Sequence, residues 1–404
     1  MNISVRNLLY TLNGAIYIFQ YITFGACDPD KFGSSLVPSK LLLHFNKSIV
    51  VSPFSLQLPL CKLASVAQGD VKVELLKFLG YQNMKMINSS YRDLNVLLTH
   101  LERIDFVMVN HIYLNYSKGY KDTLSKPAFG VEVQKVSFNY PKAATIYINR
   151  MIDRVTFKRL SDVLIKEDIT KDSSMLLINA AYLTATWEVP FNILHTKHNI
   201  KFRYYNQSTV FVPMMFKSEE VLYVDDDLNK IKVINMKLAS PGVSMTFVIP
   251  EDRKSLQDFL RNLLRPNYFR TIKKRMRMEF LNIAIPRFKL KTLVDWTDSL
   301  QKVGLKKLFD KNSTGLNNMM INQATSKPLY ISKVKQKNFI EVNEMGAYRI
   351  ITTESQYSKM PHLRPTLEAV ADRPFYFTVT LHFDRSNYWN TEELFTGVYY
   401  GPDT

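Results

Sequence analysis

Hydrophobic residues gather in apolar runs that predict buried strands at three separate places in the chain. Residues 105–114 and residues 244–250 are short runs of this kind, and the second ends at a proline. Residues 174–191 contain a longer run, as expected for a strand that is covered on both faces. We expect this strand to end in a turn at which Trp187 and Phe191 seal the end of a sheet.

Apolar residues recur at helical spacing at residues 148–165, between two of these strands, and at residues 256–264, after the last of them. Residues 28–46 predict a short first helix. Pro38 should interrupt it, because proline has no amide hydrogen to donate to the preceding turn. We find no internal repeat, low-complexity tract or linker, which favours a single domain.

The longest segment without a regular pattern lies between two predicted strands near the end of the chain. Residues 329–346 have strand character up to Gly346, and residues 373–381 resume it. The roughly 25 residues between them show no sustained helical period, and irregular segments of this length are usually functional.

Composition allows a large core, and the charge is strongly basic. The chain has 404 residues, 46% of them hydrophobic, which suffices for one large or two ordinary domains. The formal net charge of +17 favours association with acidic surfaces such as glycosaminoglycans, anionic lipid or nucleic acid. The alternative is a soluble protein that is merely basic.

The densest basic run spans residues 270–277 and is the candidate site for a sulfated glycan or another polyanion. Its candidate binding residues are Arg270, Lys273, Lys274, Arg275 and Arg277. The alternative reading of this run is an ordinary solvated face.

The first 26 residues have the order of a secretory signal peptide, with Arg6 before an apolar stretch and small residues at its end. We therefore expect a secreted, extracellular protein formed by residues 27–404, with no other segment able to span a bilayer. Asn-x-Ser/Thr triplets are compatible with this route and mark candidate glycosylation sites at Asn46, Asn88, Asn115, Asn206 and Asn312. Cys27 and Cys61 can form at most one disulfide.

The usual enzyme signatures are absent from the sequence, including the nucleophile elbow, the zinc-protease helix, the phosphate loop and the dinucleotide fingerprint. His195 and His198 are interpreted as surface histidines, and His111 as a structural histidine within a strand. Residues 225–227 are three aspartates that favour a turn over an acid/base pair. We expect no catalytic residue, no metal and no cofactor.

Several motifs occur in the same order as in a known family. Residues 339–346 read Phe-Ile-Glu-Val-Asn-Glu-Met-Gly, and residues 179–191 combine Asn-Ala, Tyr, Trp and Pro-Phe at characteristic positions. The chain resembles the serpins, the serine protease inhibitor superfamily, over residues 48–402. Further matches are Ser52, Pro53, Ser55, Pro374, Phe375, Phe395, Gly397 and Val398.

The resemblance implies an α+β serpin fold, with a large central mixed/antiparallel β-sheet, further sheets, surrounding helices and an exposed reactive loop at about residues 346–372. A monomer and a serine protease partner are also implied. The resemblance marks Ser52, Ser55, Asn179 and Gln336 as residues of the region where the central sheet opens. Gln336 replaces a histidine that contacts the asparagine in many serpins, and Lys158 stands where the family usually has glycine.

Inhibitory serpins act by a one-way change of fold, in which the cleaved loop inserts into the main sheet as an extra strand. The hinge would comprise Glu344, Gly346, Ala347, Arg349 and Ile351. Alternate residues of an inserted strand face the core, which selects Ala347, Arg349, Ile351, Thr353 and Ser355. An unpaired guanidinium in a closed sheet costs roughly several kcal/mol. The alternative is that Arg349 reaches solvent at the end of the sheet.

The expected bait residues are Lys359, Met360 and Pro361. Proline after the scissile bond blocks most serine proteases, whereas Lys359-Met360 would suit a trypsin-like enzyme. Three hypotheses follow: a secreted serpin that inhibits weakly or not at all, a working inhibitor cut near Lys359, and a polyanion-binding protein. The third is compatible with either of the others, and a shared fold does not choose between the first two.

Overall fold

The computed structural model describes most of the chain between residues 33 and 402. Its described ranges are residues 33–44, 47–89, 91, 101, 104–116, 119–121, 129–204, 206, 208–265, 267–321, 328–346, 367–385 and 388–402. The expected leader, Asn46, Cys27 and the loop residues 347–366 lie outside them. The loop residues outside the described ranges include the predicted hinge and bait residues Ala347, Arg349, Ile351, Lys359, Met360 and Pro361.

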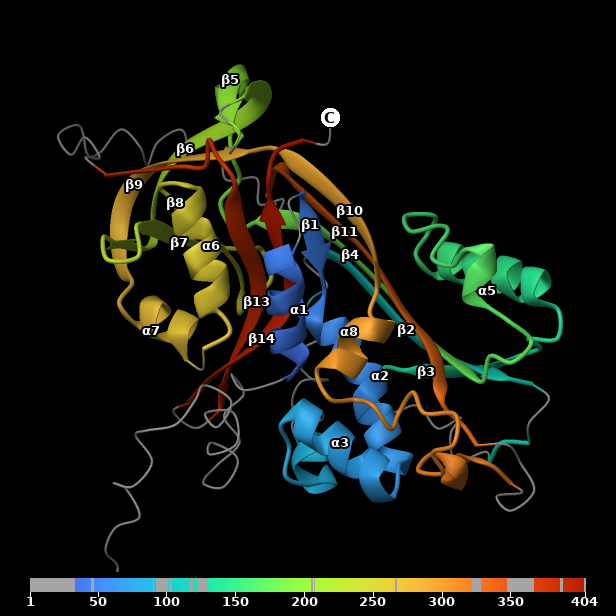
Figure 1. The fold of residues 1–404 in the computed structure, drawn as a ribbon. Coiled ribbons are helices and arrows are strands. Elements are labelled where there is room, and N and C mark those ends of the chain that lie inside the picture. The colour runs from blue at the N-terminus through green and yellow to red at the C-terminus, as the bar shows by residue number, and fades with distance from the viewer. Residues whose placement is uncertain are drawn as a thin grey trace, which may run out of the picture.

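A five-stranded mixed sheet crosses the molecule (Figure 1) in the order β10-β11-β4-β2-β3. Its strands are β10 (Phe288–Asp295), β11 (Ile331–Gly346), β4 (Met175–Trp187), β2 (Asp105–Asn115) and β3 (Glu132–Val136). The pairs β11–β4 and β2–β3 are parallel, and the other two neighbouring pairs are antiparallel.

A nine-stranded sheet lies beside it in the order β1-β14-β13-β8-β7-β6-β9-β12, with β5 also paired to β6. The bounds are β1 (Ile49–Val51), β5 (Lys197–Arg203), β6 (Thr209–Asp226), β7 (Ile231–Lys237), β8 (Val243–Pro250), β9 (Arg277–Pro286), β12 (Leu367–Val370), β13 (Phe375–Arg385) and β14 (Tyr388–Tyr399). This α+β arrangement, with a mixed central sheet and a further sheet, is the expected fold class.

Helices surround the two sheets (Figure 1). They are α1 (Gly33–His44), α2 (Pro53–Val66), α3 (Gly69–Leu79), α5 (Pro141–Val155), α6 (Arg253–Asn262), α7 (Tyr268–Lys274) and α8 (Thr297–Lys302), with short 3-10 turns η6 (Lys166–Asp168), η7 (Ile193–His195) and η8 (Asn317–Met319). None of the helices in the described ranges is long and apolar enough to cross a membrane.

The hydrophobic core has two parts, one on each face of the five-stranded sheet. The larger part fills the space between the sheets and helices and contains Leu177, Leu183 and Trp187. The smaller part lies under α5, where Ile148 and Ile152 pack with apolar residues of β2 and β4. The α5 helix therefore covers the outer face of the sheet.

The apolar runs found in the sequence form the expected strands. Residues 105–114 lie in β2, residues 244–250 lie in β8, and β4 occupies most of residues 174–191. Trp187 and Phe191 are buried, with their rings in edge-to-face contact at a centroid distance of 5.7 Å. The helix expected at residues 256–264 is α6.

The helix predicted at residues 148–165 is wrong at both ends. α5 begins at Pro141 and ends at Val155, where the Thr156 hydroxyl donates to the carbonyl of Ile152 at 2.7 Å. Phe157 and Lys158 then adopt left-handed backbone angles, with φ of 51° and 61°. Lys158 thus occupies a conformation that favours glycine, which agrees with the family usually having glycine there.

Two other boundaries differ from the predictions. Pro38 lies inside α1 instead of interrupting it, and Leu42 further along the helix is buried in the core. One proline removes a single helical hydrogen bond, and tertiary packing can offset that cost. The segment expected to be loop up to residue 372 ends earlier, because Leu367–Val370 forms β12, paired in parallel with β9.

Candidate functional site: the seam between β4 and β11

The parallel contact between β4 and β11 is the line along which an extra central strand would have to enter. The two strands are paired from Ile331 opposite Met175 to Gly346 opposite Trp187, with a register shift after Val342. We call this contact the seam. Since β4 and β11 are hydrogen-bonded neighbours, any chain that entered here would first have to break their shared ladder.

The hinge end of the seam is held by a buried carboxylate. Glu344 accepts a hydrogen bond from the Thr196 hydroxyl at 2.8 Å, and its second oxygen lies 3.9 Å from the guanidinium of Arg287. Its backbone carbonyl accepts from the amide of Phe191 at 3.1 Å. The indole nitrogen of Trp187 donates to the carbonyl of Asn343 at 2.8 Å. Of the expected hinge residues, the structure describes Glu344 and Gly346.

Lys217, on β6, covers the aromatic pair at this end of the seam, and sequence reasoning missed it. Its ammonium lies 4.4 Å from the ring centre of Phe191 and 5.7 Å from that of Trp187, and it pairs with Glu219. Burial lowers the pKa of Lys217, and Glu219 partly opposes this shift. The local sequence, Phe216-Lys217-Ser218-Glu219, carries no signal that this lysine stacks on aromatic rings.

The four residues expected at the opening region lie together in the buried centre of the seam. Gln336 donates to the carbonyl of Ser52 at 2.8 Å and accepts from the Ser52 amide at 3.3 Å. Asn179 donates to the carbonyl of Ser55 at 2.9 Å. The Ser52 hydroxyl donates to the carbonyl of Leu394, and all four expected side chains are buried. Asn110, on β2, lies against Ser55 and Asn179 and was not anticipated.

Gln336 and Asn179 are register partners, but the glutamine amide is engaged elsewhere. Its oxygen also accepts from the indole of Trp296 at 3.3 Å and from the amide of Asn338 at 3.0 Å. The side-chain oxygen of Asn179 is buried and has no hydrogen-bond partner among the described residues.

A connection over the outer face of the sheet ties the two sides of the seam together. We call residues 156–168, which lead from α5 towards β4, the strap. On β11, the ammonium of Lys335 lies 2.7 Å from the carboxylate of Asp168, and Lys337 donates to the carbonyls of Ser161 and Asp162. These two lysines belong to β11, whereas the strap is the segment that leads into β4. Their contacts therefore join β11 to the connection of the neighbouring strand.

The strap also binds the side of the sheet that contains β4. Its Arg159 pairs with Asp105 on β2 and lies over the ring of Tyr182 on β4, 4.3 Å from the ring centre. Tyr182 stacks in turn on Phe339 of β11 across the seam, at 5.0 Å. The strap therefore bridges both sides of the seam, so parting the strands would disturb its contacts.

The contact between Lys335 and the strap is buried, which raises the cost of breaking it. Lys335 and Asp168 expose 8% and 5% of their side chains. Burial, reinforced by the nearby charge of Lys291, lowers the pKa of Lys337, although its ammonium still has carbonyl partners on the strap. Separating a buried charge from its partner is more costly than breaking an exposed pair.

The basic run at residues 270–277 is partly committed to internal contacts. Arg275 pairs with the buried carboxylate of Asp226, and Arg277 donates to the carbonyl of Met276 at 3.0 Å. Lys273 lies over the ring of Phe269, with its ammonium 5.0 Å from the ring centre. Lys274 is exposed. The run therefore falls on the end of α7 and the start of β9 and is not a uniformly solvated set of cations.

Four of the candidate glycosylation sites lie in described ranges, and one of them is buried. Asn88, Asn206 and Asn312 are exposed. The side chain of Asn115 is 5% exposed, and its amide nitrogen lies 3.3 Å from the carbonyl of Ser173, to which it donates. The expectation of a glycan at Asn115 does not fit the folded chain, because the nitrogen that would carry it is enclosed.

The remaining residues considered in the sequence are three histidines, three aspartates and Cys61. His111 is buried, with its ring nitrogens 2.8 Å from the Tyr113 hydroxyl and 3.1 Å from Glu132, as expected for a structural histidine. His195 and His198 are exposed, and no metal-binding group of three or more suitable side chains occurs in the described ranges. The aspartates at residues 225–227 lie at the turn between β6 and β7. Cys61 is buried with a free thiol.

These features define an α+β protein with a closed parallel seam in its central sheet and a long segment between β11 and β12. The chain matches the family model described as "Serpin (serine protease inhibitor)" over residues 29–388, and it belongs to the serpin family.

Known relatives and structures agree with this assignment. The chain is 25% identical over 357 residues to "Antitrypsin" of Bombyx mori, covering 87% of this chain and 89% of that protein. It is 27% identical over 358 residues to "Alaserpin" of Manduca sexta, with the same coverage of 87% and 89%. The solved structure of native protease nexin-1 with heparin aligns with a TM-score of 0.78 at 20% identity, covering 93% of this chain and 98% of that one.

Proposed function

We propose that this serpin is a secreted target of serine proteases that inhibits them weakly or not at all, because insertion of its loop into the central sheet is hindered. The first obstacle to insertion is Arg349. By its place after Gly346 it would face the core of the sheet if the loop inserted. Ile350 and Ile351 are also bulkier than the small residues that the family usually has there.

The strap across the seam is the structural observation that supports the proposal most strongly. Insertion requires β4 and β11 to part, and Lys335 would then have to leave Asp168 or pull the strap with it. Since an inhibitor must insert its loop before the protease hydrolyses the acyl-enzyme, a slower opening favours release of cleaved protein. Pro361 adds a further obstacle, because it follows the expected bait residue Met360.

A second candidate function is a working inhibitor of a trypsin-like protease, cut near Lys359-Met360. The hinge end of the seam favours it, since the point from which an inserted strand would start is ordered. There the indole of Trp187 donates to the carbonyl of Asn343, and Glu344 pairs with Arg287. The relative named antitrypsin is compatible with this reading.

Binding of a sulfated glycan at residues 270–277 can coexist with either function. The structural relative crystallised with heparin supports the idea of a polyanion site in this fold. All five residues of the run remain candidates, and removing Arg275 would also leave the buried carboxylate of Asp226 without its ion pair.

The remaining expectations stay proposals about the mature protein. The leader in residues 1–26 supports secretion, and Asn88, Asn206 and Asn312 are the exposed triplets that a glycan could reach. Asn46 remains a candidate from the sequence. We infer a monomeric binding protein, with no catalytic residue of its own and no cofactor.

The test is incubation with trypsin-like proteases followed by denaturing electrophoresis. We expect cleavage within residues 347–366 with little SDS-stable complex, because the acyl bond is hydrolysed before the loop inserts. A stoichiometric covalent complex would reject the proposal and establish the second candidate function.

A further inference from the structure

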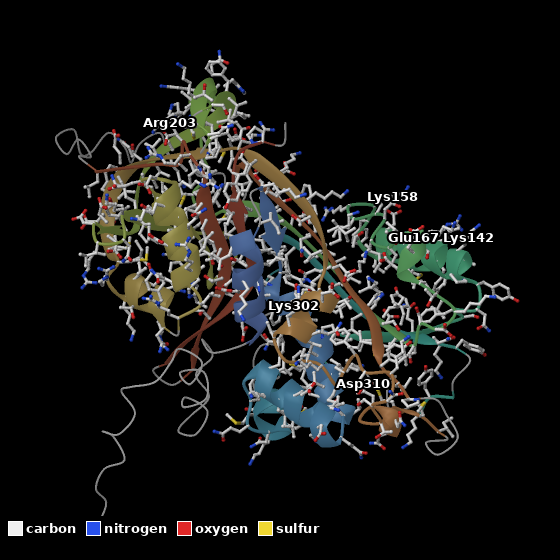
Figure 2. All side chains as sticks on the ribbon, viewed as in Figure 1. Lys142, Lys158, Glu167, Arg203, Lys302 and Asp310 are labelled. Atoms are coloured by element: carbon white, nitrogen blue, oxygen red, sulfur yellow. The ribbon has the colours of Figure 1, made fainter. Side chains whose placement is uncertain are left out.

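The outer face of α5 carries cations that have no acidic partner in the part of the chain that the structure describes. One face of this helix buries Ala144, Ile148 and Ile152 against the sheet. The opposite face presents exposed basic residues, and Lys158 follows directly after the helix. The four cations are Lys142, Arg150, Arg154 and Lys158, and none of their charged groups has an ion pair or hydrogen bond among the described residues. Figure 2 shows Lys142 and Lys158 around α5.

Three of these cations lie in one row along the helix. Residues 142, 146, 150 and 154 are each four apart, so their side chains lie on one side of the helix, one turn above another. Asp153 is half-buried on α5, and the exposed acidic residues of the neighbouring strap and β3 include Asp162, Glu167 and Glu132. The outer face of α5 itself therefore keeps an excess of positive charge.

Large apolar side chains are exposed between and beside these cations. Ile146 and Tyr147 expose 52% and 47% of their surface on the same face of α5, and Phe157 exposes 76% at its end. Tyr140 and Ile165 are also exposed near the two ends of the helix and the strap. Clusters of exposed apolar residues on a soluble protein are unusual and indicate a binding surface.

We propose that this face of α5 binds the surface of an anionic lipid bilayer. Unpaired lysines and arginines are attracted to acidic headgroups, and aromatic and aliphatic side chains enter the boundary between headgroups and acyl chains. A soluble glycan would use the cations but would gain little from Ile146 or Phe157. α5 lies at the right edge of the molecule in Figure 1, where a flat surface can reach it.

This surface differs from the basic run at residues 270–277. Within the described ranges the cations on α5 form no ion pair, whereas Arg275 pairs with the buried Asp226. Sequence reasoning selected the run because its cations are consecutive, and it missed α5 because the cations there are separated by apolar residues. Binding at α5 does not depend on whether the reactive loop inserts.

The experiment is co-sedimentation of the full mature protein with vesicles of phosphatidylcholine, with and without about one third phosphatidylserine. We expect binding to the acidic vesicles alone, weakening as salt is raised. Two double variants separate the contributions: Arg150→Glu with Arg154→Glu, and Ile146→Ser with Tyr147→Ser. The charge variant should weaken binding by about 10-fold or more, and the apolar variant by about 3-fold or more.

The matched control is Lys302→Glu with Lys306→Glu, which makes the same change of charge on exposed residues of α8 and the segment after it. It should bind vesicles almost as the natural protein does. Equal loss in this control would show diffuse attraction and overturn the proposal, as would absence of binding to acidic vesicles. If the apolar variant binds normally, or the charge variant loses retention on heparin instead, the surface is a site for soluble polyanions and the lipid assignment is wrong.

Discussion

Lys335 and Asp168 form a buried ion pair across the outer face of the central sheet, with the ammonium nitrogen 2.7 Å from a carboxylate oxygen. One partner lies on β11, and the other lies in the strap that leads to β4. Because these two strands must separate before a further strand can enter between them, the pair couples an electrostatic contact to the opening of the seam.

Removing one partner of this pair should destabilise the protein more than replacing both. Asp168→Leu leaves the buried Lys335 with only the carboxylate of Asp295, 3.9 Å away, and is expected to cost up to about 3–5 kcal/mol of stability. Asp168→Leu with Lys335→Met should recover most of that loss, but not the hydrogen bond that Asp168 accepts from the Ile165 amide. Thermal or urea unfolding measures both. The control is Lys333→Met, which removes a more exposed pair with Asp295 and should cost about 1 kcal/mol or less. Equal effects of Asp168→Leu and Lys333→Met would show that the strap contact is weak.

Arg349→Thr should increase the fraction of protease that is trapped. The substitution replaces a cation with a small side chain at a position that would face the core, and so lowers the cost of insertion. Densitometry of the covalent band after reaction with trypsin measures the change, which we expect to be several-fold. Arg364→Thr is the matched control, because residue 364 follows the expected bait residue and would not enter the sheet. If the two variants trap the same fraction of protease, Arg349 does not block insertion.

Retention on heparin should fall when Lys273 and Lys274 are replaced by alanine, and it should fall steeply with added salt. Arg275 is left in place, because its removal would strand the buried carboxylate of Asp226. The midpoint of salt elution from a heparin column measures the effect. Unchanged elution of the double variant would show that the run takes no part in binding polyanions.

His382 should make the protein less stable in mild acid. Its ring nitrogen lies 2.8 Å from the Ser244 hydroxyl and 2.9 Å from the Thr380 hydroxyl, and burial, with the charge of Lys273 second, lowers its pKa from 6.5 to about 4. Between these values the unfolded chain takes up a proton that the folded protein does not, so stability falls as the pH drops from about 6.5 towards 4.

The expected loss from this histidine between about pH 7 and pH 5 is about 1–2 kcal/mol, or roughly 2 °C in melting temperature for a chain of this size. His382→Gln keeps a hydrogen-bonding side chain and removes the titration. The variant should therefore lose about 2 °C less than the natural protein over the same pH interval. Identical pH dependence of the two would assign the acid sensitivity to other groups.

The sequence predicted β4 from its long apolar run and β11 from its β-branched and aromatic residues, and motif resemblance supplied their arrangement. It misjudged α5 for a physical reason. Leu160, Val163 and Leu164 in the strap are buried and continue helical spacing, although the backbone there is irregular. Spacing alone cannot distinguish a helix from an extended segment that buries residues at similar intervals.

The electrostatic contacts of the site could not be predicted from local sequence. Lys335 and Asp168 are far apart in the chain, and a lysine in a strand ordinarily points to solvent. Asn115 shows the same limit, since its triplet suggests a glycan while the fold encloses its side chain. Charge and triplet patterns report composition, whereas burial depends on which distant segments cover each residue.

The melting temperature of the loop-cleaved protein, compared with that of the uncleaved protein, tests hindered insertion most directly. Cleavage within residues 347–366 frees the segment after Gly346 to join the sheet if the seam can open. We predict a rise of no more than a few degrees, because Arg349 and the strap oppose insertion. A rise of tens of degrees, as an added central strand would give, would contradict this account and show that the seam opens readily.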